Sequence, residues 1–182
     1  MKRYILILLA ILAVTACKKS DAETAYTAQA ELIDQYISSE LEYNPDYTVV
    51  RNGKTVRLIT RQGEGEEVGD NGLVSMYYAI YDFSNGSISS TTLFETNNES
   101  TASAAGLDTS DESKFQPVVV NTSDKNLLKG LRMGLKGVKA QENCVILFPG
   151  SEAFGKETTG NVAKFSALAV KVWVEDIEND ID

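Results

Sequence analysis

The fold is decided by the stretch that reads NCVILFPGSEAFG from Asn143 to Gly155. In its first six residues two sets of side chains alternate, namely Cys144, Ile146 and Phe148 with Asn143, Val145 and Leu147. Successive side chains of a strand point to opposite faces, so this pattern predicts a strand with one face committed to a core. The same alternation returns at residues 168–175 and indicates a second core strand.

Working towards the N-terminus, the sequence predicts one short helix between strands. Leu128, Leu131 and Leu135 follow a helical spacing, with Asn126 near the start and Gly137 just past the end. Before this helix, residues 118–120 form a short apolar run of the kind found in strands.

Further upstream, residues 73–83 are rich in aromatic and β-branched side chains and predict a longer strand. Asn52-Gly53 lies between β-forming residues and predicts a two-residue hairpin, with residues 56–60 as the returning strand. Residues 63–67 are predicted to be a solvated turn. Residues 84–116 are rich in Ser, Thr, Asn and Asp and predict a surface excursion, anchored by Leu93-Phe94.

The order of elements is strands, one short helix and strands again, without the alternation of parallel α/β folds. This predicts an α+β domain in which an antiparallel sheet wraps around one short helix. An N-terminal helix precedes it, because apolar residues recur at helical spacing from Tyr26 to Leu41 and Asn44-Pro45 follows. We interpret this helix as a stalk or packing helix, with a dimerisation helix as the alternative.

The first residues have the pattern of a secretory signal peptide. Lys2 and Arg3 precede an apolar run at residues 5–14, which is too short to span a bilayer as a helix. The following Val14-Thr15-Ala16-Cys17 resembles a bacterial lipobox, which implies lipidation of Cys17. The alternative is a leader cut by ordinary signal peptidase. The predicted divisions are therefore a signal peptide (1–16), a lipidated N-terminus with its helix (17–45) and a β-rich domain (46–182) with the excursion at 84–116.

A lipidated Cys17 would anchor the protein in the cell envelope through several acyl chains. Lys18-Lys19 do not resemble the acidic residue that retains lipoproteins in the inner membrane, so we expect the outer membrane of a Gram-negative source. Residues 18–23 loosely resemble surface-export signals of Bacteroidetes lipoproteins, which leaves the periplasmic and the surface face both open. The acidic body should stand off anionic headgroups.

Composition excludes several kinds of chemistry. The chain has 26 acidic and 17 basic residues, no histidine and only two cysteines. It therefore has no His-based catalytic site, no His-ligated metal site and no disulfide framework, and we expect no metal and no cofactor. An acidic chain without a basic stripe is also a poor partner for nucleic acid. Cys144, on the apolar face of a predicted strand, should be a protonated core residue.

One reaction needs no titrating group. Rotation about a prolyl peptide bond transfers no proton, and its barrier of about 18–20 kcal/mol arises from lost amide resonance. A dry apolar cleft disfavours the charge-separated resonance form and can bind the twisted prolyl group better than the planar one. A thousandfold acceleration requires about 4 kcal/mol.

From about Leu58 to Glu175 the chain resembles the FKBP-type peptidyl-prolyl cis-trans isomerases, especially the lipoprotein branch found in Bacteroidetes. Residues 148–155 are similar to the family's Ile-Pro-x-x-x-Ala-Tyr-Gly, and residues 127–135 to its Val-Ile-x-Gly-Trp-x-x-Gly-Leu helix. Phe94-Glu95 resembles the family's Phe-Asp, and residues 167–172 resemble its last strand. The resemblance implies an FKBP-like fold.

It also implies a set of pocket residues, carried over position by position: Tyr78, Phe94, Glu95, Leu127, Leu128, Leu131, Phe154 and Val170. Tyr78 keeps step with Val74 and Met76, and Tyr77 is the alternative register. Leu131 stands for the family's floor Trp, Phe154 for a Tyr whose hydroxyl binds a ligand carbonyl, and Val170 for an aromatic residue. The same side chains would also suit plain core packing.

Three functions are therefore in competition. The first is an isomerase that helps exported proteins fold by binding Xaa-Pro segments of proline-containing peptides or unfolded chains. The second is an FKBP-like binding or chaperone lipoprotein with little turnover. The third is a surface lipoprotein with a glycan-handling or structural role, its specificity lying in residues 84–116.

Overall fold

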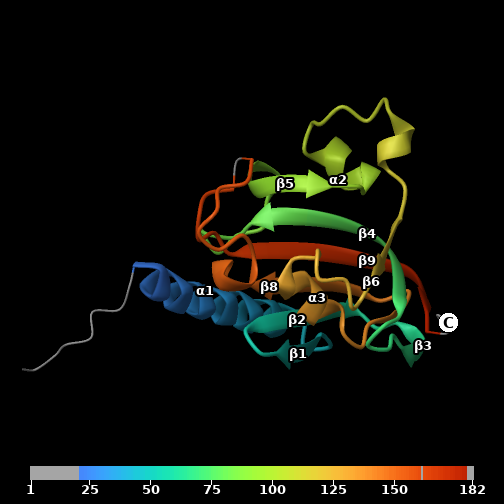
Figure 1. Ribbon diagram of the computed structural model, residues 1–182, viewed down its shortest axis with the longest axis horizontal. Helices are drawn as coiled ribbons and strands as arrows, with labels where there is room; N and C mark the ends of the chain where they lie inside the picture. The colour runs from blue at the N-terminus through green and yellow to red at the C-terminus, as the bar shows by residue number, and fades with distance from the viewer. Residues whose placement is uncertain (1–20, 161, 180–182) are drawn as a thin grey trace, which may run out of the picture.

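The computed structural model describes residues 21–160 and 162–179 (Figure 1). The predicted signal peptide and Cys17 lie outside these residues. The described helices are α1 (Asp21–Tyr43), α2 (Glu99–Ala104) and α3 (Lys129–Leu135). The strands of the main sheet are β1 (Thr48–Asn52), β2 (Thr55–Arg61), β4 (Leu73–Asp82), β5 (Leu93–Thr96), β6 (Val118–Asn121), β8 (Asn143–Phe148) and β9 (Leu168–Glu178). A small second sheet pairs β3 (Glu64–Glu67) with β7 (Lys139–Ala140).

The main sheet is antiparallel throughout, in the order β1-β2-β8-β9-β4-β5. β4 pairs along one side with β9, and its other side is shared, because β6 pairs with residues 73–76 and β5 with residues 79–81. Among the described helices, α3 packs on one face of this sheet, against β8 (Figure 1). The predicted α+β class, with an N-terminal helix, an antiparallel sheet and one short helix against it, is confirmed.

α3 approaches the sheet closely because two of its residues are glycines. A Cβ atom on Gly130 would lie 2.1 Å from Cγ of Phe148, and one on Gly134 would lie 2.2 Å from Cγ2 of Ile146. Both distances are far inside van der Waals contact, so any larger residue would push the helix away from β8. The two glycines therefore fix the depth at which Leu131, between them, sits against the sheet.

α1 covers the opposite face of the sheet. Its buried Ile33 and Ile37 pack with Val56 of β2 and Leu147 of β8, and Figure 1 shows the blue helix running beside these strands. Tyr36 of α1 also packs edge-on against the ring of Phe83, with ring centroids 5.4 Å apart. Burying each isoleucine contributes about 1.5–3 kcal/mol. α1 is thus a packing helix in this protein.

A buried ion pair, Arg57 with Glu142, lies at the C-terminal end of α3 and caps its last carbonyl groups. Arg57 of β2 donates hydrogen bonds to the carbonyl oxygens of Gly134, Lys136 and Gly137, at 3.0, 2.7 and 3.1 Å. Its Nε lies 3.4 Å from Oε1 of Glu142, and the two side chains are only 5% and 2% exposed. The last carbonyl groups of a helix have no hydrogen-bond donors within the helix, and the guanidinium of Arg57 provides the donors here. Burial raises the pKa of Glu142, and the charge of Arg57 opposes that shift.

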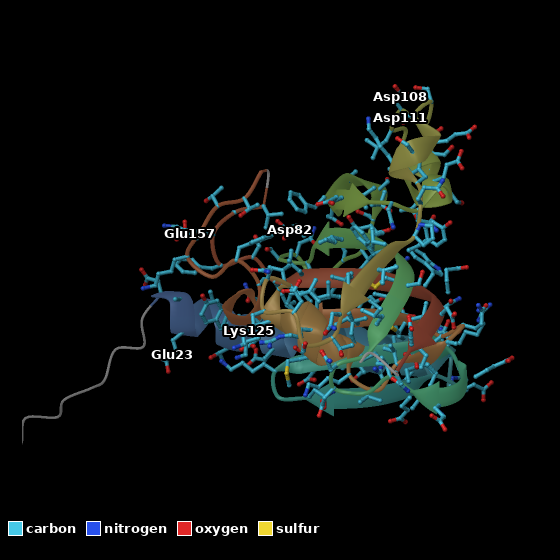
Figure 2. All side chains as sticks on the ribbon, turned by 45° about the vertical axis from the view of Figure 1, so that its right-hand side comes forward. Glu23, Asp82, Asp108, Asp111, Lys125 and Glu157 are labelled. Atoms are coloured by element: carbon cyan, nitrogen blue, oxygen red, sulfur yellow. The ribbon has the colours of Figure 1, made fainter. Side chains whose placement is uncertain are left out.

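Two segments differ from the sequence-based expectation. The predicted turn at residues 63–67 contains an exposed strand, β3, paired with β7. Residues 84–116 are not one loop, because β5 returns to the edge of the sheet and α2 follows it. β5 has only four residues, with Leu93 and Phe94 side by side and no alternation of apolar and polar residues, so the sequence did not predict a strand there. The tip of the segment, with Asp108 and Asp111, projects from the domain (Figure 2).

Candidate active site

An apolar cluster on the α3 side of the sheet brings the predicted site residues together. Most of its buried side chains come from α3, β4, β8 and β9, with Ile59 of β2 and three loop valines, and half-buried side chains pack against them. The predicted residues in this cluster are Tyr78, Phe94, Leu127, Leu128, Leu131, Phe154 and Val170. They come from five separate parts of the chain, so the fold, and not proximity in sequence, assembles them.

Tyr78 joins the cluster to a carboxylate. Its hydroxyl donates a 2.6 Å hydrogen bond to Oε1 of Glu95, which is exposed on β5. Burial, and secondarily Glu95, raises the pKa of Tyr78 above its ordinary value of 10.0. The hydroxyl therefore stays protonated at physiological pH and remains a donor. Tyr78 packs with Val74 and Met76, whereas Tyr77 is not among the described side chains of the cluster.

The backbone at Tyr78 is held by a polar residue that the sequence did not reveal. The side chain of Asn97 accepts from the Tyr78 N–H at 2.6 Å and donates to the carbonyl oxygens of Met76 and Gln116. Asn97 is buried, so these bonds replace those it would make with water. It connects β4 with the segment before β6 and steadies the wall on which Tyr78 lies. Nothing in the polar stretch around Asn97 distinguishes it from its exposed neighbours.

Two aromatic rings form the outer wall of the cluster. Phe94 of β5 and Phe154, in the loop after β8, meet edge to face with centroids 6.2 Å apart and an interplanar angle of 74°. Both rings are partly exposed. An edge-to-face pair of this kind contributes about 0.5–1.5 kcal/mol beyond the area it buries. The wall is thus ordered by its own packing and still open to a ligand.

The remaining predicted residues differ in their access to solvent. Leu127 and Leu128 are half-buried beside α3, and Leu131 lies beneath them, nearly buried. Val170 is 0% exposed, so it packs inside the cluster and does not line a surface. Ile80, Val118 and Val120 also pack on the cluster and were not predicted as site residues. Val118 and Val120 are two residues apart in a predicted strand and therefore lie on one face, which could have predicted that both contact the cluster.

A cavity of about 220 Å³ adjoins the cluster at Phe94. Its other lining residues are polar: Asp82, Ser84, Asn85, Thr91 and Thr92. Figure 2 marks Asp82, near the end of β4. A larger cavity of about 480 Å³ lies between α1 and the β1–β2 hairpin and contains none of the predicted site residues.

The site offers shape and hydrogen bonds in place of acid–base groups. Among the described residues, no three His, Cys, Asp or Glu side chains gather closely enough to hold a metal ion. Burial raises the pKa of Cys144 far above its ordinary value, so this thiol is a protonated core group. Within residues 21–160 and 162–179, moreover, no helix combines the length and apolarity needed to cross a bilayer.

Comparison with known proteins places the fold. No protein-family model matches the chain, and no curated protein matches it in sequence. A multi-domain immunophilin from Arabidopsis thaliana matches with a TM-score of 0.57 and 19% identity, over 75% of this chain and 48% of its own, so this chain spans about half of that protein. The N-terminal domain of FKBP42 from the same plant gives 0.54 and 19%, over 74% and 94%.

A peptidyl-prolyl cis-trans isomerase from Pseudomonas syringae matches with a TM-score of 0.57 and 16% identity. The match covers 89% of this chain and 99% of that one, so it includes nearly the whole of both. At such identities the likeness concerns the fold. The chain has the fold of the FKBP-type peptidyl-prolyl isomerases.

Proposed function

We propose that this protein is a peptidyl-prolyl cis-trans isomerase that binds Xaa-Pro segments on the apolar cluster. The observation that carries the proposal is that Tyr78, hydrogen-bonded to Glu95, and the Phe94–Phe154 ring pair belong to one apolar cluster. Because the single hydrogen of the Tyr78 hydroxyl is donated to Glu95, the pair offers fixed acceptor oxygens beside an apolar surface, which suits a peptide with one apolar ring and flanking N–H groups.

In this mechanism the prolyl ring packs above Leu131, between Tyr78 and the two phenylalanines. The main chain at Leu127 and Leu128 lies beside the ring and hydrogen-bonds the peptide backbone. Exclusion of water from the prolyl carbonyl disfavours the charge-separated form of the amide, so the C–N bond twists more easily. No proton changes place, and the absence of histidine from the chain is no obstacle.

The proposal is tested by a protease-free isomerase assay on the full-length protein with a series of Xaa-Pro peptides. We expect catalysed exchange, with kcat/KM varying less than about twofold between about pH 6 and about pH 9. The reason is that histidine is absent and the raised pKa of Tyr78 keeps its hydroxyl protonated over that range. No acceleration with any peptide would refute isomerase activity. Improved refolding of a client without cis-proline would then favour the chaperone alternative.

We further propose that the protein acts in the cell envelope, held by lipid on Cys17. The support is the lipobox-like Val14–Cys17 after a basic and apolar leader. In a bacterial host, the intact mass should exceed that of the bare 17–182 chain by the acyl groups. Cys17→Ser should accumulate as the uncleaved precursor, whereas Cys144→Ser, the matched control, should be processed and lipidated. Normal processing of Cys17→Ser would rule the anchor out.

A further inference from the structure

One buried side chain of α1 reaches the loop that carries Phe154. Gln29 is only 7% exposed, although it lies on a helix with a largely polar outer surface. Its Oε1 accepts from the N–H of Gly150 at 2.9 Å, and its Nε2 donates to the carbonyl oxygen of Phe165. Gly150 and Phe165 lie near the two ends of the segment between β8 and β9. A single amide therefore bridges both ends of the loop.

Gly150 and Phe165 are in direct contact at this bridge. A Cβ atom on Gly150 would lie 2.3 Å from the carbonyl oxygen of Phe165, so only glycine allows the two backbones to approach so closely. Phe165 itself has a φ of +66°, a backbone conformation that non-glycine residues adopt only when their surroundings hold them. Its ring packs edge-on against Tyr26 of α1, with centroids 6.0 Å apart. α1 thus holds Phe165 by its ring and by its carbonyl.

The restraint extends from this contact to the site. The N–H of Gly155 donates to the carbonyl of Gly150 at 2.9 Å, and the N–H of Phe165 donates to the carbonyl of Gly155 at 2.6 Å. These two bonds close the turn in which Phe154 lies. A continuous set of hydrogen bonds therefore runs from Gln29 to Gly155, the residue next to Phe154. Phe154 packs with the apolar cluster on the α3 side, whereas Ile33 and Ile37 of α1 pack on the other face of the sheet.

We propose that Gln29 is a positioning residue, which fixes the turn at residues 150–155 and so aims Phe154 at the prolyl group. This inference rests on the proposed isomerase function for its catalytic meaning, and on the hydrogen bonds alone for its structural content. In this proposal α1 helps to position the residues of the site, although it contributes none of the residues that contact the peptide. If Gln29 only satisfied its own polar groups, removing it would leave the hydrogen-exchange rates of the Gly155 and Phe165 N–H groups unchanged, because Gln29 bonds to neither of these N–H groups.

The test compares Gln29→Ala with Gln35→Ala in the full-length protein. Gln35 is the matched control, since it is the same residue type on the same helix and is exposed. Native-state hydrogen exchange is measured at the N–H groups of Gly155 and Phe165, and kcat/KM is measured on an Xaa-Pro peptide. For Gln29→Ala we expect exchange about tenfold faster at both amides, with unchanged exchange in β8 and β9. We expect kcat/KM to fall about tenfold. Gln35→Ala should change neither.

Unchanged exchange at Gly155 and Phe165 in Gln29→Ala overturns the proposal. So does faster exchange with an unchanged kcat/KM, because the loop would then loosen without consequence for the site. If the unmodified protein shows no isomerase activity, the proposed function fails, and the exchange measurement by itself still decides whether Gln29 holds the turn.

Discussion

Replacing Arg57 with alanine should lower the free energy of unfolding by about 3–5 kcal/mol, the cost of leaving one partner of a buried ion pair alone. The variant loses the charge that faces Glu142 and the donors to three carbonyl groups at the end of α3. Those carbonyls and the carboxylate stay buried without their partner, and each such group is costly. Urea denaturation monitored by Trp173 fluorescence measures the loss.

The matched control is Arg51→Ala on the neighbouring strand. Arg51 pairs with Asp34 at 2.8 Å, but both side chains are more than half exposed, and such pairs contribute about 0–1 kcal/mol. A difference of less than about 1 kcal/mol between the Arg57 and Arg51 variants would contradict the argument from burial.

The destabilisation by Arg57→Ala should also depend on pH. The raised pKa of Glu142 in the folded protein means that its contribution to stability is complete below its ordinary value of 4.5 and falls as pH rises through the raised value. Arg57 is the largest of the influences that oppose the cost of burying the charged form of Glu142, and the variant loses it. The effect of the substitution should therefore be larger near about pH 7 than near about pH 4.

Replacing Phe154 with alanine should reduce kcat/KM about 10–100-fold, because a half-buried aromatic ring worth about 1.5–3 kcal/mol is lost from the wall of the site. The loss of stability should be smaller, about 1–2 kcal/mol, since the ring is partly exposed and its removal opens the surface without making a closed cavity. The isomerase assay and urea denaturation on the same preparation measure the two effects.

Tyr36→Ala provides the comparison. Tyr36 is also a half-buried aromatic residue in an edge-to-face pair, but it packs on the opposite face of the sheet against Phe83. Its loss should cost similar stability and leave kcat/KM unchanged. If the two variants lose activity in proportion to their stability, Phe154 is a packing residue and not part of a site.

Periodic apolar residues made much of the fold predictable. The alternation in residues 143–148 and 168–175 and the leucine spacing from Leu128 to Leu135 each correspond to an observed element, β8, β9 and α3. Tyr78 was placed with Val74 and Met76 by the same alternation, because a strand keeps every second side chain on one face.

The polar residues that hold the structure together were not predictable in this way. Arg57, Asn97 and Gln29 each bond to backbone groups that are distant in sequence, and such bonds follow no period. A buried polar residue looks in the sequence like its exposed neighbours. Only the three-dimensional arrangement reveals which backbone groups need it.

The packing of α1 on the sheet determines the shortest fragment of this protein that can fold on its own. The division expected between residues 45 and 46 separates a helix from a β-rich segment along the chain, yet Ile33 and Ile37 share one apolar layer with Leu58 and Leu147. A fragment that began at Asp46 would present that layer to water, and fragments of this kind would adhere to one another. Shortened versions meant for crystallisation or grafting should therefore begin no later than Asp21.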